Sequence, residues 1–342
     1  MRVLIWHKKD VPWLPYLYSP VTDTLLAGFR AASGVDLVLG WGTTRPGTNR
    51  PDAPAFVRNL SSLQRGDVYV WVGMGTGWEM WQTPWKDLWS RGVTCVLYQT
   101  EPADICIGSR TGRYPVHEIW DFSLHNFEAC QGKKDGPIPR YVPLAHVPGS
   151  PAVRPPLRGV ERPMMFFGDP SNRYPKRKAC YKKLKSALGS KVRHTYRAFS
   201  HEMFATNVLA HNDIFVNLHK GCGQAHNPIT WRNAKLLNSQ KMIISERAHP
   251  KDETEYDGMM LWAENMSHVV ALYRHYAGGA WRDFAQKAAA RFRRKFDAVD
   301  IFERAGIYRR LGLSLADGER RRGVRGRATN VSCELCAPHK AP

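Results

Sequence analysis

The sequence predicts an α/β protein of two domains, each a parallel β-sheet covered by helices on both faces. Three observations support this fold class. The chain has 342 residues, which suits two domains of about 150 residues better than one. Short apolar segments, typical of buried parallel strands, alternate with helical patterns. A stretch with eight prolines, residues 137–163, separates two such series, because proline at this density interrupts helices and central strands.

The first series predicts five strands with helical or loop segments between them. It opens with the apolar residues 2–6, whose run stops at Trp6 and is too short for the core of a signal peptide. The expected strands are at residues 2–6, 36–39, 67–72, 93–98 and 118–121, and the clearest helical or loop stretches are at 22–32 and 78–91.

The second series repeats this alternation. Asn227 and Pro228 are typical of the start of a helix, as the capping residue and the first-turn proline. The expected strands are at residues 164–168, 191–196, 213–219, 241–246 and 259–263, and the expected helices are at 176–188, 201–210, 227–239, 266–276 and 280–304. The last of these is a single long, basic, amphipathic helix.

These patterns divide the chain into five segments. We expect an N-terminal Rossmann-like domain and a C-terminal Rossmann-like domain that face each other across a cleft. A helical segment and a basic tail without fixed structure complete the chain. The boundaries are residues 1–150 for the first domain, 151–162 for a proline-rich linker, 163–279 for the second domain, 280–314 for the helical segment and 315–342 for the tail.

The positive charge points to an anionic partner. Lys and Arg number 50 against 30 Asp and Glu, a formal net charge of +20. Residues 173–197 hold ten Lys or Arg and no Asp or Glu, and five arginines lie between Arg320 and Arg327. The first region is either a solvated helix face or a diphosphate-binding surface. The tail is either disordered or makes a weak contact with an anionic surface such as nucleic acid.

The cysteines and the hydropathy of the sequence predict the compartment of the protein and whether it binds a metal. No apolar run reaches the roughly 18 residues of a membrane span, and the seven cysteines form no disulfide framework. We therefore expect reduced thiols and a cytoplasmic protein. We expect no bound metal. Two sets of three possible ligands remain as alternatives, each short of the four that a closed zinc site needs: Cys333–Cys336–His339 and His219–Cys222–His226.

Polar residues at the ends of the expected strands form a candidate site in the second domain. Ligands of open α/β sheets bind at the carboxyl ends of the strands, where helix N-termini favour phosphate and a carboxylate can accept a hydrogen bond from a sugar hydroxyl. Glu246 could instead cap a helix or form an ion pair at the surface. The candidate residues of this phosphate- and hydroxyl-binding site are Gly168, Asn172, Arg173, Asn217, His219, Lys220, Arg232, Asn233 and Glu246.

The first domain supplies candidates for a catalytic base. Glu101 follows the strand expected at residues 93–98, and His125 follows the strand expected at 118–121. A carboxylate or imidazole at a strand end is suited to take a proton from an acceptor hydroxyl, although such residues are as readily structural. Five tryptophans between Trp71 and Trp89 either pack in a core or offer aromatic faces to a sugar.

An ordered set of sequence segments spans roughly residues 1–276. It begins with MRVLIW, VLYQTEP and EIWDFSLHNFEA, continues with PRYVPLAHVPG and MMFFGDPSNRYPKRKACYKKL, and ends with DIFVNLHKG, NPITWRNAKLLNSQKMIISE and MMLWAENMSHVVALYRHY. In order and spacing, this set resembles the GT-B-fold glycosyltransferases, especially the group related to the spore-coat type. The resemblance implies transfer of a sugar from a nucleotide-diphosphate sugar to an acceptor without a tightly bound metal or other cofactor. It places the donor in the C-terminal domain and the acceptor in the N-terminal domain.

One departure from the family pattern bears on activity. In the family, a stretch resembling R-x-x-E-A-L carries a glutamate that contacts donor hydroxyls. Here Arg232 matches, but none of the three residues after it, Asn233, Ala234 and Lys235, is a glutamate, and we assign Ala234 to the glutamate position. Glu246 or Asn233 is expected to compensate. The alternatives to an active enzyme are a GT-B-like binding or scaffold protein without turnover and a basic nucleic-acid-associated protein; the acceptor, whether glycan, protein or small molecule, is not specified.

Overall fold

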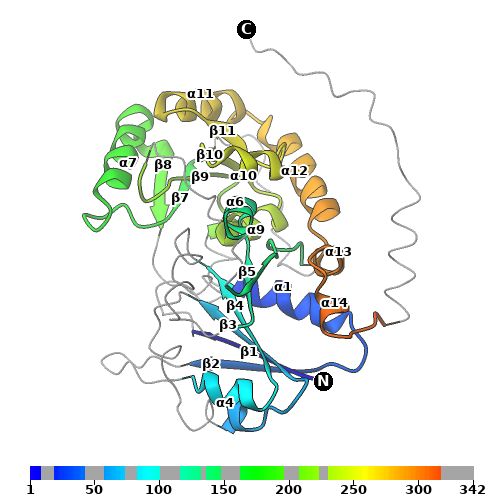
Figure 1. Ribbon diagram of the computed structural model, residues 1–342. Coiled ribbons are helices and arrows are strands. Elements are labelled where there is room, and N and C mark those ends of the chain that lie inside the picture. Colours follow the sequence, from blue (N-terminus) through cyan, green and yellow to red (C-terminus); the bar gives the residue numbers. More distant parts are fainter. Residues whose placement is uncertain are drawn as a thin grey trace.

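The computed structural model contains two parallel sheets, one formed by each half of the chain (Figure 1). Both sheets were expected from the alternation of apolar strands with helices. The described residues are 1–8, 19–42, 58–73, 83–100, 116–131, 136–147, 162–195, 208–222 and 230–316. Among them, no helix combines the length and apolar character that crossing a membrane requires.

The first sheet is six-stranded, with the order β2-β1-β3-β4-β5-β6, and every pair is parallel. Its central strands are buried on both faces, as expected where helices cover a parallel sheet. The strands are β1 (Arg2–Lys8), β2 (Asp36–Gly42), β3 (Val68–Gly73), β4 (Thr94–Gln99), β5 (Glu118–Asp121) and β6 (Ile138–Tyr141).

The second sheet is five-stranded, with the order β11-β10-β9-β7-β8, and is also entirely parallel. Strands β7, β9 and β10 lie side by side, so their carboxyl ends share one edge. The strands are β7 (Met164–Phe167), β8 (Val192–Thr195), β9 (Ile214–Asn217), β10 (Met242–Glu246) and β11 (Leu261–Ala263).

The helices of the described residues cover both sheets and join the two halves. In the first half they are α1 (Ser19–Arg30), α4 (Trp85–Ser90) and α6 (Leu124–Cys130). In the second half they are α7 (Pro175–Leu188), α9 (Thr230–Asn238), α10 (Pro250–Glu255), α11 (Met266–Tyr276), α12 (Trp281–Lys295), α13 (Ala298–Arg304) and α14 (Ile307–Arg310).

Two sequence-based expectations about these elements are wrong. The helix expected over residues 280–304 is two helices, because the Asp297 side chain accepts hydrogen bonds from the Val299 and Asp300 amides and so caps a new helix, α13. The stretch 137–163, where prolines are expected to interrupt helices and strands, nevertheless forms the strand β6 in its first part. Pro139 is tolerated there because β6 is an edge strand, paired with β5 alone.

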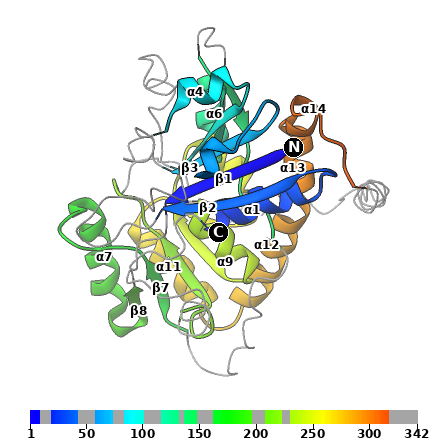
Figure 2. The same cartoon turned by 90° about the horizontal axis from the view of Figure 1, so that it is seen from below.

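The C-terminal helices return to the first domain. Figure 1 shows α12 and α13 running along one side of both sheets, and Figure 2 shows them beside α1. Phe302 of α13 packs edge-on against Phe29 of α1, with ring centroids 5.1 Å apart, and the Tyr308 hydroxyl donates to the Gly28 carbonyl at 2.7 Å. One apolar core therefore extends from the first sheet through these helices to the second.

Gly28 is where this return is most tightly packed. A Cβ atom at Gly28 would lie 2.4 Å from the Phe302 ring. We expect Gly28→Ala to lower the free energy of unfolding by about 1–3 kcal/mol, because the ring must move away from α1. Urea unfolding measures the change. Gly278→Ala is the control, since no atom lies within 4 Å of its Cβ position, and an equal loss in both variants would contradict the prediction.

A second junction joins α6 of the first domain to α10 of the second. The buried Asp252 carboxylate accepts hydrogen bonds from the Ser123 hydroxyl at 3.0 Å and from the Leu124 amide at 2.9 Å. A residue of one domain thus caps a helix of the other. Lys251 forms an ion pair with Glu128 beside it. These contacts join α6 directly to α10.

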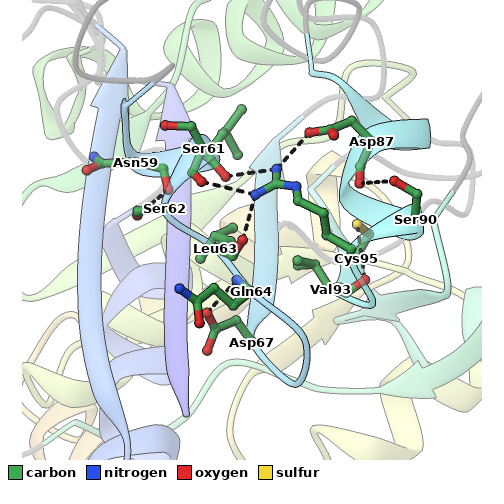
Figure 3. Close-up of polar contacts among 12 residues, drawn as sticks. Asn59, Ser61, Ser62, Leu63, Gln64, Asp67, Asp87, Ser90, Val93 and Cys95 are labelled. Carbon is green, nitrogen blue, oxygen red and sulfur yellow. Dashed lines mark hydrogen bonds and ion pairs between the residues drawn. The ribbon is translucent and has the colours of Figure 1, made fainter.

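At the amino ends of the strands of the first sheet, a cluster of hydrogen bonds fixes the neighbouring loops. Figure 3 shows the carbonyls of Ser61 and Leu63 and the carboxylate of Asp87 converging on one guanidinium group, that of Arg91. This group lies near the amino ends of β3 and β4, away from the edge where ligands of such sheets bind. Trp71 and Trp85 are buried in the same core, which favours the packing interpretation for these two tryptophans. Trp78 and Trp81 lie outside the described residues.

Candidate functional site

Three segments follow neighbouring strands at the carboxyl edge of the second sheet. The loop after β7 leads into α7, the turn after β9 carries His219 and Lys220, and β10 ends with Glu246. Gly168 begins the first of these segments. A Cβ atom there would lie 2.5 Å from the Phe166 ring, so only glycine allows the chain to leave the strand along this path.

Three cations surround the ring of Tyr174, which immediately precedes α7. The Arg177 guanidinium lies 4.9 Å from the ring centroid, that of Arg173 lies 5.6 Å away, and Lys220 Nζ lies 5.9 Å away. The amino end of the 14-residue α7 adds its own partial positive charge. Side chains from two loops and a helix thus make one positive region at the strand ends.

Two arginines of this region are buried. Arg177 is 3% exposed and donates from Nε to the His219 carbonyl at 3.3 Å, and Arg232 is 7% exposed and lies over the Phe167 ring at 5.4 Å. Burial, together with the positive charge of Arg177, lowers the pKa of Arg232 to about 9. Burial likewise lowers the pKa of Arg177. Two desolvated like charges make a place where an anion is strongly favoured.

A buried polar network lies next to the arginines. The Glu246 carboxylate accepts a hydrogen bond from the His219 amide at 2.6 Å. Asn217 donates to the Ser245 hydroxyl at 2.9 Å and lies 3.4 Å from His219 Nε2. Glu246 therefore fixes the turn that carries His219 and Lys220. The predicted Asn217, His219 and Glu246 come together as a hydrogen-bonded group.

A cavity of about 500 Å³ opens beside this network. Its size suits part of a small ligand. Its walls come from α7, the turn after β9, the end of β10 and the start of α11. The lining includes Cys180, Lys183, Cys222, Glu246, Glu264 and Asn265.

Two of the lining residues contradict the expectation of reduced thiols. Cys180 and Cys222 form a disulfide, with Cα atoms 6.4 Å apart and a separation of 42 positions in sequence. The pairing arises because α7 and the turn after β9 extend from adjacent strands. Cys222 therefore bonds to sulfur, and the alternative metal set with His219 and His226 loses one ligand; His226 lies outside the described residues. The Cys333–Cys336–His339 set is also outside them.

Two predicted donor residues contact side chains outside the charged cluster. Asn172 is exposed and accepts a hydrogen bond from Lys178 Nζ at 2.5 Å. Asn233 is buried and its amide approaches the Met260 sulfur at 3.2 Å, while Ala234 is buried in the core beside it. Asn233 thus faces the interior and brings no polar group to the Glu246 network.

Of the two candidate bases in the first domain, the structure describes His125. Glu101 lies outside the described residues. His125 lies at the junction of the domains, where its ring stacks on His249, with centroids 3.5 Å apart. Burial, followed by the charge of His249, lowers the pKa of His125, which keeps its imidazole neutral near pH 7.

The sequence-based prediction missed Arg177 and Tyr174. Arg177 is one of ten basic residues in residues 173–197, and charge alone does not distinguish it from its neighbours. Its spacing does: it precedes Cys180 by three residues and Leu184 by seven, which places it on the inward face of α7. A charged residue on an apolar helix face is a signal for a buried functional group.

No family model matches the chain, and no curated protein matches it in sequence. Solved structures match its fold. Sucrose-phosphate synthase from Thermosynechococcus elongatus is 12% identical with a TM-score of 0.57, and the match covers 91% of this chain and 99% of that one. HepE from Anabaena, solved in complex with UDP-glucose, is 9% identical with a TM-score of 0.56, covering 90% and 98%.

A structure of trehalose-6-phosphate synthase, from work on glycosyltransfer with retention, is 10% identical with a TM-score of 0.57, and covers 91% of this chain and 99% of that chain. At these identities the likeness concerns the fold, and it extends over nearly the whole chain. The two parallel sheets, their order and the returning C-terminal helices therefore make this a protein of the GT-B fold, as the resemblance in sequence predicts.

Proposed function

We propose that the protein is a glycosyltransferase that binds a nucleotide-diphosphate sugar at the carboxyl edge of the second sheet and transfers its sugar to an acceptor hydroxyl. The observation that carries the proposal is the convergence of Arg177, Arg232 and Lys220 at this edge of a GT-B fold. A positive site formed by buried guanidinium groups and a helix N-terminus suits a diphosphate.

The residues have distinct roles in the proposed reaction. The bond between the anomeric carbon and the diphosphate oxygen breaks, while the acceptor oxygen bonds to that carbon and its proton passes to a base. Negative charge accumulates on the departing nucleoside diphosphate. Arg177, Arg232 and Lys220 stabilise that charge, and we propose that they do so without a bound metal. Glu246 holds the turn that bears Lys220 and lines the cavity for the sugar.

The acceptor side involves the first domain in this proposal. His125 is suited to accept a proton because its neutral form predominates near pH 7. It lies on α6, at the junction facing the second domain. Glu101 remains the other candidate base. The acceptor in this proposal is a compound with a free hydroxyl group.

A thermal-shift screen tests the donor site. UDP and UDP-glucose are the first probes, followed by GDP, CDP and their sugars. A nucleotide at about 100 times its dissociation constant is expected to stabilise the folded protein by about 2.7 kcal/mol. The shift should persist in EDTA if basic side chains alone hold the diphosphate. Absence of any shift across the panel would contradict the proposed function.

A second candidate is a GT-B-like binding protein without turnover, and Ala234 favours it. The stretch after Arg232 carries no carboxylate: Ala234 is buried, and the neighbouring Asn233 faces Met260. The same screen separates the candidates when it is followed by an assay for release of free nucleoside diphosphate from the stabilising sugar nucleotide. Release marks the enzyme, and tight binding without release marks the binding protein.

A further inference from the structure

The disulfide lies inside the proposed donor site. Cys180 is in the second turn of α7, Cys222 is in the turn after β9, and both line the cavity beside Glu246. Both residues are partly exposed, so a small thiol in the cavity can reach the bond. Cys95 is different: it is fully buried, and burial raises the pKa of its thiol to about 12, which makes it unreactive.

The bond joins the two segments that carry the cations. Arg177 precedes Cys180 by three residues on α7, and Lys220 precedes Cys222 by two. The Arg177 guanidinium and the Cys222 amide both donate to the His219 carbonyl, at 3.3 Å and 3.4 Å. The covalent bond therefore fixes the spacing between the helix that bears Arg177 and the turn that bears Lys220.

The turn itself is held in an uncommon conformation. Cys222 has a φ of +24°, on the left-handed side that residues other than glycine seldom adopt. The Glu246 carboxylate and the two sulfurs lie within 4.8 Å of one another. Breaking the bond frees Cys222 to relax and separates two sulfurs next to the carboxylate that holds the His219 amide. The effect of reduction is thus expected to reach the turn.

We propose that Cys180 and Cys222 form a thiol–disulfide switch in which the disulfide form binds the donor tightly and the dithiol form binds it weakly. The inference rests on the proposed function, because it concerns that donor site. An external dithiol supplies two electrons and two protons: the Cys180–Cys222 bond breaks, both residues become thiols, and the reductant forms its own disulfide. A disulfide oxidant reverses the step. Disulfides of this kind, open to solvent and placed at a site, are typical of redox regulation.

The first experiment establishes the redox chemistry. The folded protein is equilibrated in mixtures of reduced and oxidised dithiothreitol, alkylated, and mapped by peptide mass spectrometry. We expect a Cys180–Cys222 linked peptide that opens and re-forms reversibly while the protein stays folded, as judged by circular dichroism. A pair that opens only on unfolding, or the absence of the linked peptide, would overturn the proposal.

The second experiment measures UDP affinity by calorimetry in the oxidised and reduced protein. Because the disulfide pre-organises the cations, we expect reduction to weaken UDP binding about tenfold. The Cys180→Ser/Cys222→Ser double variant should bind weakly under both conditions. Cys130 is also disulfide-bonded, and Cys130→Ser is the matched control that should keep the full redox response.

The outcomes separate this inference from the proposed function. Equal UDP affinity in the two redox forms overturns the switch and leaves the donor site standing. If UDP does not bind, the same comparison is made with whichever nucleoside diphosphate the screen identifies. Binding by none of them, in either form, overturns both. A redox response retained in the double variant assigns the effect to other cysteines and rejects the proposal.

Discussion

Replacing Arg177 with methionine is expected to weaken nucleoside diphosphate binding between about tenfold and 150-fold while leaving the free protein as stable as before, or more so. Hydrogen bonds to charged groups contribute about 1.5–3 kcal/mol, which gives this range of affinities. Arg177 is buried close enough to Arg232 for their like charges to repel, and this repulsion is relieved in the variant. A methionine fills much of the same space without charge.

The opposing effects on binding and stability distinguish a ligand site from a structural cation. Calorimetric titration with UDP measures affinity, and urea unfolding measures stability. Lys182→Met on the exposed face of the same helix is the control, and it should change neither quantity measurably. A large loss of stability in Arg177→Met with unchanged UDP affinity would show that Arg177 serves only to hold the His219 carbonyl.

The location of the site followed from the sequence, but its composition did so only in part. Parallel strands bring their carboxyl ends to one edge, so strand ends alone predicted that Asn217, His219 and Glu246 lie together, as they do; their binding of a donor stays a prediction. Arg177 lies in the helix after β7, and it is one of ten basic residues in 173–197 that could bind a diphosphate equally well on sequence alone. The fold selects it by burying the one guanidinium that packs against Tyr174 and Phe166.

Each departure from the expected fold has a physical cause. The helical period continues through Asp297, so the sequence read as one helix, yet the side chain of Asp297 caps a second one. Pro139 argued against a strand because proline cannot donate to a ladder, a restriction that an edge strand does not impose. The Cys180–Cys222 pair joins residues 42 positions apart, and such pairing depends on which strands are neighbours. The local pattern of apolar residues does not reveal which strands are neighbours in the sheet.

Stability is expected to fall as pH rises from about 4 to about 7, because of Asp121 at the end of β5. Complete burial raises the pKa of its carboxyl to about 7, and the nearby Asp252 adds to the increase despite the hydrogen bond from the Ser123 amide. The folded protein thus binds this proton more tightly than the unfolded chain does. Stability from this group is fully present below about pH 4 and is lost as pH rises through about 7.

Asp121→Asn should abolish this loss. A rise of about 3 pKa units corresponds to at most about 4 kcal/mol, so relative to the wild-type protein the variant gains up to that amount between pH 4 and pH 8. Urea unfolding at pH 4.5, 6 and 8 measures the difference, and the exposed Asp283→Asn serves as the control. Unfolding free energies that differ by the same amount at every pH would contradict the raised pKa. Asp121 and Asp252 lie close together where α6 contacts α10. The pH dependence of the unfolding free energy is therefore a measure of this contact between the two domains.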